Sequence, residues 1–191
     1  MSLLPIRVLG DPVLRKETVP VRDVTADLRR LVDDMVETMH AAKGIGLAAP
    51  QVGRSERVTV IEIDEELLVL LNPEIVRRTG KIMWEEGCLS IPEVYAKVER
   101  ASDVTVRAMD LDGKPFELDG TDLLAVCLQH EIDHLHGKLF LDRLSLLKRR
   151  SALKVWDEVK EDYPDLLRHL KPGHEPGDRG HENGHRDNER L

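Results

Sequence analysis

The sequence predicts a mixed fold in which a long run of strands lies between helices. Residues 25–42 repeat apolar side chains at the spacing of an amphipathic helix. From Arg57 the pattern changes to the alternation that is typical of strands, and at about Thr121 it returns to helical spacing. With 191 residues the chain is long enough to bury a real core, and we expect one domain over residues 1–170.

Composition limits the classes of function. The apolar content of 41% fits a globular protein, and no apolar run is long enough to cross a membrane. The first residues lack the pattern of a secretory signal, so we expect a cytoplasmic protein. A formal charge of -8 argues against a general nucleic-acid-binding surface. In a reducing compartment the two cysteines are better suited to a metal ligand, a nucleophile or a core position than to a disulfide.

The first part of the chain predicts an arm followed by a helix. The arm ends at the turn signal Gly10-Asp11-Pro12 and is expected to lie on the body of the protein. The helix over residues 25–42 has a charged outer face and an apolar inner face. We expect His40, near its end, to be a surface residue that interacts with the helix terminus.

A glycine-rich segment follows at residues 44–53. It lacks the signature of a phosphate-binding loop, and two interpretations remain open. It is either a turn between helix and sheet, or a backbone that an extended ligand approaches and pairs with. The side chain of Gln51 has both a donor and an acceptor, so its NH2 group could stabilise an oxyanion.

Strands are expected over most of the middle of the chain. Asn72-Pro73 closes one strand, Gly80 marks a turn, and Asp110-Leu111-Asp112-Gly113 predicts a hairpin turn. Residues 85–92 interrupt the pattern and predict a loop that presents Cys88. The expected strand segments are 57–63, 67–72, 74–84, 94–100, 103–109 and 115–120.

Helical patterns return in the last third. One begins at about Thr121 and can end at Gly137, and another covers about Ser145 to Leu170 with a break or kink at Pro164. Residues 171–191 are polar and charged and are expected to be disordered. We expect no specific metal site from the histidines of this tail, His174, His181 and His185.

The segment from Leu123 to Leu135 contains a metal-site spacing. His130 and His134 are four residues apart, so on a helix they emerge on nearly the same side and can hold one ion. Glu131 is then placed to contact a water as a general base without ligating the ion. The imidazole pair continues an apolar stripe of Leu123, Val126 and Cys127. A solvated helix without metal is the alternative.

A catalytic metal usually has a third protein ligand. In one class of zinc proteases the third ligand is a histidine ten residues after the first. Here that position is Phe140, which excludes this arrangement. Glu158 or Glu161 could serve, but the context of Cys88 favours its thiolate. Cys127 precedes His130 on the same helix face and is expected to fill a pocket wall as a small hydrophobe.

Three segments together resemble the signature motifs of the peptide deformylase family, in its order and with similar intervals: Gly44-Ile45-Gly46-Leu47-Ala48-Ala49-Pro50-Gln51, Glu86-Gly87-Cys88-Leu89-Ser90 and Gln129-His130-Glu131-Ile132-Asp133-His134. The opening arm from Gly10 to Arg15 is also similar to the family. The resemblance covers about residues 5–165.

The resemblance implies an α+β fold in which antiparallel strands wrap around the metal-binding helix, with an N-terminal and a C-terminal helix. It implies a hydrolase that removes the formyl group from the starting methionine of nascent chains. Its cofactor would be Fe2+, with Zn2+ or Ni2+ as substitutes. The substrates would be N-formylmethionyl peptides, with a transient ribosome contact and no membrane or sequence-specific nucleic-acid partner.

The resemblance also implies roles for individual residues. Cys88, His130 and His134 would ligate the metal, and Glu131 would be the acid and base. Gln51 and the Leu89 backbone N–H would form the oxyanion hole. Ile45 and Gly46 would pair with the peptide backbone. The positions that would line the methionine pocket are Ile45, Trp84, Glu86, Leu123, Val126 and Cys127.

One position departs from part of the family, since Tyr95 stands where some members have arginine. Two other functions remain open, an endopeptidase that uses Glu158 as the third ligand and a noncatalytic peptide-binding module stabilised by metal.

Overall fold

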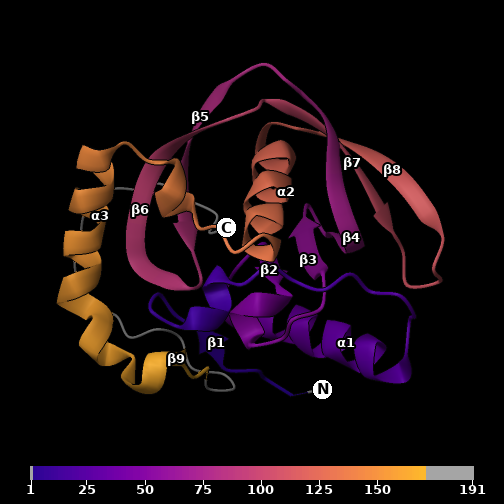
Figure 1. Cartoon of the computed structure of the whole chain (residues 1–191), viewed down its shortest axis with the longest axis horizontal. Coiled ribbons are helices and arrows are strands. Elements are labelled where there is room, and N and C mark those ends of the chain that lie inside the picture. Colours follow the sequence, from indigo (N-terminus) through magenta and orange to yellow (C-terminus); the bar gives the residue numbers. More distant parts are fainter. Residues whose placement is uncertain (1, 171–191) are drawn as a thin grey trace.

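The computed structural model describes residues 2–170, so the prediction of a disordered tail over residues 171–191 lies outside the described residues. Helix α2 (Asp122–Leu135) lies in the middle of the fold, and all of its residues from Ala125 to Leu135 are buried. Strands surround it on two sides, while the other two helices lie on the outside (Figure 1). The α+β fold with a central helix is thereby confirmed.

The larger sheet has five antiparallel strands in the order β2-β3-β4-β7-β8. These are β2 (Gly46–Ala48), β3 (Val58–Ile63), β4 (Glu66–Thr79), β7 (Asp103–Met109) and β8 (Pro115–Thr121). The predicted hairpin turn connects β7 to β8, and Gly113 has the positive φ of 77° that such a turn requires. Because β2 is the first strand in the order, its free edge faces away from β3.

A second sheet consists of the hairpin β5 (Ile82–Cys88) and β6 (Ile91–Arg100). The expected loop over residues 85–92 is therefore wrong, because only Leu89 and Ser90 form the turn. Glycine had suggested a loop, but Gly87 lies at a register shift within the strand. The ring of Tyr95 packs so closely there that a Cβ on Gly87 would lie 2.7 Å from its Cε1 atom. The glycine allows this contact without ending the strand.

The expected strand end at Asn72-Pro73 is also wrong, because β4 continues through it to Thr79. The pairing of β4 with β7 shifts register between Leu71 and Glu74, so the missing N–H of Pro73 falls where the ladder is already interrupted. The Asn72 side chain instead bonds both backbone groups of Val21. The asparagine therefore attaches the N-terminal segment to the sheet.

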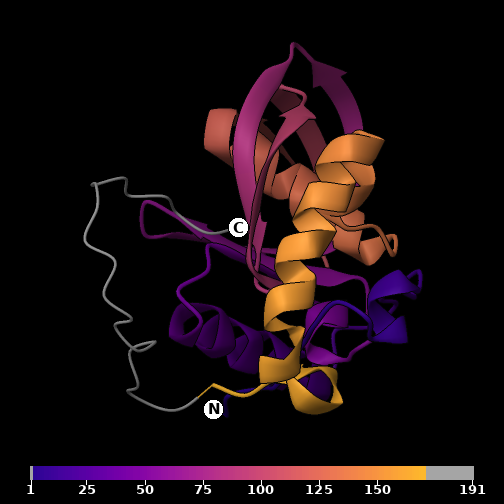
Figure 2. The ribbon, with the colours of Figure 1, turned by 90° about the vertical axis from the view of Figure 1, so that its left-hand side faces the viewer.

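The outer helices are α1 (Ala26–Ala41) and α3 (Leu146–Val159). Helix α1 confirms the prediction for residues 25–42, and the Thr25 side chain caps its first turn by accepting from the Leu28 amide. Helix α3 packs against β6 through Ala152 and Trp156 (Figure 2).

The C-terminal helix is shorter than the pattern up to Leu170 predicts. The chain leaves helical geometry before Pro164, since Tyr163 has a ψ of 69°, and proline disfavours helix at the preceding residue. It continues through two short 3-10 turns, Lys160–Asp162 and Pro164–Leu166, into β9 (Leu167–Arg168). Strand β9 pairs with β1 (Ile6–Arg7). The backbone pairing of Ile6 with Arg168 and of Arg7 with Leu167 therefore holds the predicted N-terminal arm on the body of the protein.

Three further 3-10 turns connect these elements. They cover Pro12–Arg15, Ala49–Val52 and Phe140–Arg143. The second continues directly from β2, and therefore sets the position of the Gln51 side chain beside the end of β5.

Candidate metal centre

Three side chains from two distant segments meet at the centre of the fold. Helical spacing places His130 and His134 on one side of α2, and Cys88 is the last residue of β5. Their ligand atoms all lie within 4.8 Å of one another, and Cys88 Sγ is 3.3 Å from His134 Nε2. All three residues are buried. Such a donor set of one sulfur and two nitrogens could hold a divalent cation and leave one position open.

The hydrogen bonds of His130 support this interpretation. Its Nδ1 atom lies 2.8 Å from Glu86 Oε2, and because a carboxylate only accepts, Nδ1 is the donor. In the neutral ring the lone pair of Nε2 is then free for a metal ion, and this buried atom has no hydrogen-bond partner among residues 2–170. Without a metal, burial alone would lower the pKa of His130, but the nearby Cys88 and the hydrogen bond to Glu86 raise it above its usual value, and a bound cation would displace that second proton. Burial also lowers the pKa of His134 well below its usual value, which keeps that ring neutral and able to ligate. The residues present therefore fit a metal ion.

Glu86 belongs to a buried chain of ion pairs behind His130. Arg100 donates from Nε and Nη2 to the two oxygens of Glu86, at 2.6 and 2.9 Å, and from Nη1 to Asp133 Oδ2 at 2.6 Å. Asp133 also accepts from Arg143. Burial alone would raise the pKa of Glu86, but the bonds from Arg100 and His130 outweigh it and lower that pKa. An ionised Glu86 fixes the orientation of the His130 ring.

The structure thus gives Glu86 a partner on either side of its carboxylate, and its expected place in a methionine pocket stays a prediction. Sequence reasoning missed the role of Arg100, although a signal existed. In the strand pattern of residues 94–100, Arg100 has the same parity as Val94 and Val98, which face the core. A charged residue at an inward position of a strand indicates a buried ion pair.

Glu131 is fully buried and follows His130 directly on α2. Its Oε2 atom lies 3.4 Å from the hydroxyl of Thr59, while Oε1 has no hydrogen-bond partner within the described residues. Burial raises the pKa of Glu131 to about 7. Gly46 lies directly against the carboxylate, since a Cβ there would be 2.4 Å from Oε1. Sequence reasoning did not identify Thr59.

Gln51 is held in one orientation beside Cys88. Its Oε1 accepts from the Ala48 amide at 2.8 Å, so the NH2 group must point the other way. Nε2 lies 3.2 Å from Ser90 Oγ and 3.7 Å from Cys88 Sγ. Leu89 follows Cys88 in the turn between β5 and β6. The structure therefore brings together both residues that were expected to form an oxyanion hole.

Residues of the expected methionine pocket gather in one apolar cluster next to the metal ligands. Burial raises the pKa of the Cys127 thiol well above its usual value, so Cys127 remains a neutral thiol, as expected for a wall residue. Gly46, which was expected to pair with the peptide backbone, lies on the edge strand β2. The cluster members among the expected site residues are Ile45, Trp84, Leu123, Val126 and Cys127.

The other candidates lie elsewhere. Glu158 and Glu161 are exposed on or after α3, and within residues 2–170 the only group of three possible ligands is that of Cys88 and the two histidines. A third ligand from α3 is therefore wrong. His40 is an exposed residue 2.6 Å from Glu62, at the end of α1, which confirms it as a surface residue. His174, His181 and His185 lie outside the described residues.

One cysteine sulfur, two imidazoles and an adjacent buried carboxyl group define the site of a metal-dependent hydrolase. A family model described as polypeptide deformylase matches residues 3–150. A curated peptide deformylase of Hydrogenovibrio crunogenus is 55% identical over 157 residues, which are 81% of this chain and 93% of that protein.

Solved structures agree with these matches. The peptide deformylase of Legionella pneumophila has a TM-score of 0.81 and 50% identity, and the match covers 84% of this chain and 96% of that one. For the enzyme of Thermus thermophilus the TM-score is 0.78 at 42% identity, with coverage of 84% and 99%. This chain belongs to the peptide deformylase family, the metal-dependent hydrolases that remove the formyl group from the N-terminal methionine of nascent proteins.

The helices of residues 2–170 include none with the length and apolar character needed to cross a membrane.

Proposed function

We propose that this chain deformylates nascent peptides with a metal held by Cys88, His130 and His134 and with Glu131 as the acid and base. The observation that carries the proposal is the meeting of these three ligand atoms within 4.8 Å beside a buried carboxylate. When bound, a divalent cation supplies Lewis acidity, which makes a nearby water more acidic and polarises a carbonyl oxygen.

Glu131 moves the proton. Its Oε1 atom has no competing partner in the described part of the chain, so it is available to accept a proton from the attacking water. A pKa of about 7 suits a group that must both take and return a proton at neutral pH, and a cation nearby would lower it. The proton is then delivered to the nitrogen that leaves with the peptide, and the formyl group departs as formate.

Gln51 and the Leu89 amide stabilise the oxygen that gains charge during attack. The orientation of Gln51 supports this role, because Ala48 holds Oε1 and leaves Nε2 on the side of Cys88. A donor that is fixed before the reaction needs no reorganisation, and the loss of one such donor typically costs about 3 kcal/mol of barrier.

The substrate binds as an extended peptide with its methionine in the apolar cluster. Edge strand β2 supports the first part of this proposal, because its free side presents backbone groups that an added strand can pair with. The cluster of Ile45, Trp84, Leu123, Val126 and Cys127 supports the second, since it offers an unbranched thioether side chain an apolar surface next to the ligands.

The central experiment measures formate release from formyl-Met-Ala-Ser by the wild type and by Glu131→Gln, with metal content determined on the same samples. We expect the variant to keep its metal and to lose at least about 100-fold in kcat. Glu158→Gln is the matched control at an exposed position and should retain full activity. A wild-type protein that releases no formate would overturn the proposed function, and an active Glu131→Gln variant would overturn the role of Glu131 alone.

We propose Fe2+ as the natural metal. Ligand chemistry alone favours Zn2+, because Zn2+ generally binds such sites more tightly than Fe2+ does, and the case for iron rests on the family resemblance. Protein purified without oxygen and loaded with Fe2+ should exceed the Zn2+ form in turnover at equal metal content. Equal rates would remove the case for iron.

We also propose a cytoplasmic location and a transient ribosome contact through the start of α3. Leu146 and Leu147 are 65% and 75% exposed there, beside the cations Lys148 and Arg150. The partner would be the negatively charged ribosome surface. Lys148→Gln with Arg150→Gln should weaken cosedimentation with ribosomes at low salt and leave deformylation of a free peptide unchanged. Equal cosedimentation of the variant and the wild type would contradict this contact.

A further inference from the structure

The structure contains a pocket behind α2 that the proposed reaction does not use. Its volume is about 380 Å³, within the range of small-ligand sites. Gln129 and Asp133 form one of its walls and lie one turn apart on α2, whereas His130 and His134 form the neighbouring row, about 100° around the helix. The pocket therefore lies on a different face of α2 from the metal ligands.

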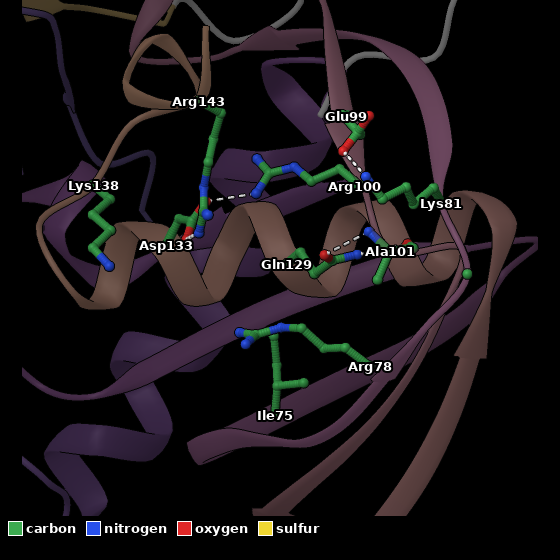
Figure 3. A pocket seen from close by; sticks show the side chains of 11 residues that line it. Ile75, Arg78, Lys81, Glu99, Arg100, Ala101, Gln129, Asp133, Lys138 and Arg143 are labelled. Atoms are coloured by element: carbon green, nitrogen blue, oxygen red, sulfur yellow. Dashed lines mark hydrogen bonds and ion pairs between the residues drawn. The ribbon is translucent and has the colours of Figure 1, made fainter.

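Its lining is rich in positive charge although the whole chain carries -8. Figure 3 shows Lys138, Arg143 and Asp133 at one end of the pocket and Lys81 and Glu99 at the other, with Arg78 along the side that faces α2. The residues that line it are Ile75, Arg78, Gly80, Lys81, Glu99, Arg100, Ala101, Gln129, Asp133, Lys138 and Arg143.

The acidic groups of the lining already have partners. Glu99 pairs with Lys81 at 2.9 Å. Asp133 uses Oδ2 for both Arg100 and Arg143, at 2.6 and 3.0 Å, and Oδ1 for Arg143 as well. A carboxylate that already accepts three hydrogen bonds has little capacity left to neutralise another cation.

Two cations therefore remain without a carboxylate. Neither Arg78 nor Lys138 has an ion pair or side-chain hydrogen bond within residues 2–170, and both are exposed to the pocket. A concave surface focuses the field of like charges, which raises the local concentration of counter-ions. The planar guanidinium of Arg78 and the ammonium of Lys138 suit the oxygens of a phosphate group.

We propose that this pocket binds a small anion of the phosphate class through Arg78 and Lys138. The anion would occupy the space between these two side chains. Ile75 and Ala101 give the pocket an apolar part, which an organic group attached to the phosphate can cover. This inference does not depend on the proposed function, because none of the proposed metal, catalytic or methionine-binding residues lines the pocket.

The experiment titrates the metal-loaded protein with pyrophosphate by calorimetry at low ionic strength. We expect saturable binding with a Kd below about 1 mM. Arg78→Gln combined with Lys138→Gln should weaken binding at least tenfold and leave the thermal midpoint and formate release unchanged. Lys16→Gln combined with Arg22→Gln removes the same charge from exposed positions outside the pocket and should bind as the wild type does.

Two results would overturn the proposal. One is the absence of saturation up to about 10 mM pyrophosphate. The other is an equal affinity of the two double variants: if both lose affinity, net charge alone attracts the anion, and if both bind as the wild type does, the anion binds elsewhere, for example at the metal ion. Inorganic phosphate and adenosine monophosphate, titrated in parallel, distinguish the source of the phosphate. Tighter binding of the nucleotide would assign the apolar part of the pocket to an organic group.

Discussion

Gly46→Ala tests whether the position of the Glu131 carboxylate limits the reaction. Gly46 is not among the glycines with positive φ, so alanine can adopt its backbone conformation without strain. The added Cβ would nevertheless lie 2.4 Å from Glu131 Oε1 and 3.1 Å from Cys127 Sγ. Because ordinary contacts of a Cβ begin at 3.4 Å, the carboxylate must withdraw by roughly 1 Å.

The expected loss follows from this displacement. A misplacement of about 1 Å at a reacting group can reduce the rate about 100-fold, which corresponds to about 2.7 kcal/mol of barrier. The backbone N–H and C=O of residue 46 are unchanged, so peptide pairing with β2 should persist. We therefore expect kcat to fall about 100-fold while KM changes by less than about threefold.

The assay is formate release from formyl-Met-Ala-Ser, with metal content and thermal midpoint measured on the same preparations. Glu131→Ala provides the background for a double-mutant cycle. If the methyl group acts through the carboxylate, Gly46→Ala should cost little more once Glu131 has been shortened. A single variant with normal kcat, or a full further loss in the Glu131→Ala background, would refute the reasoning.

Two other changes test the partners of the site. Thr59→Val removes the hydroxyl beside Glu131, whose one proton is shared between the Leu47 carbonyl at 3.0 Å and this carboxyl at 3.4 Å. The hydrogen bond to Glu131 lowers the pKa of that carboxyl, so its loss should move the acid limb of the pH–rate profile up by roughly half to one pH unit. An unchanged or lower limb would contradict this, with Thr59→Ser as the conservative control. Arg100→Met leaves the buried carboxylates Glu86 and Asp133 without their shared partner. Urea unfolding of the metal-free protein should then show that the free energy of unfolding falls by about 3–5 kcal/mol. A fall of less than about 1 kcal/mol would contradict a stabilising role for these two ion pairs.

The sequence predicts those features that depend on local geometry. The spacing of apolar residues is enough for α1, and the hairpin turn at residues 110–113 follows from its own four residues. The same holds for the histidine pair, since any helix over residues 122–135 places His130 and His134 on one side. The contact of Cys88 with this pair does not follow from spacing: the sequence context of Cys88 favoured it as the third ligand, and the family resemblance implied the same ligand set.

The wrong predictions have a common physical cause. Glycine, asparagine and proline indicate interruption in an isolated segment, yet Gly87 and Asn72-Pro73 lie within strands of the structure. In both cases a shift of register accommodates the residue, and a neighbour from elsewhere occupies the space. Whether a turn-forming residue ends a strand or bends it depends on the partner strand.

Partners of the site residues are harder to predict than the ligands, because nothing in their local sequence requires them. Thr59 lies 72 positions before Glu131, and its alternating strand context predicts only a buried β-branched residue. Arg100 differs, since an arginine on the inward face of a strand must find carboxylates or it destabilises the fold. A charge that breaks an apolar pattern is therefore more informative about a buried site than a polar residue that fits the pattern. By that criterion the sequence indicates that Arg100 has buried carboxylate partners, while the role of Thr59 could be found only in the structure.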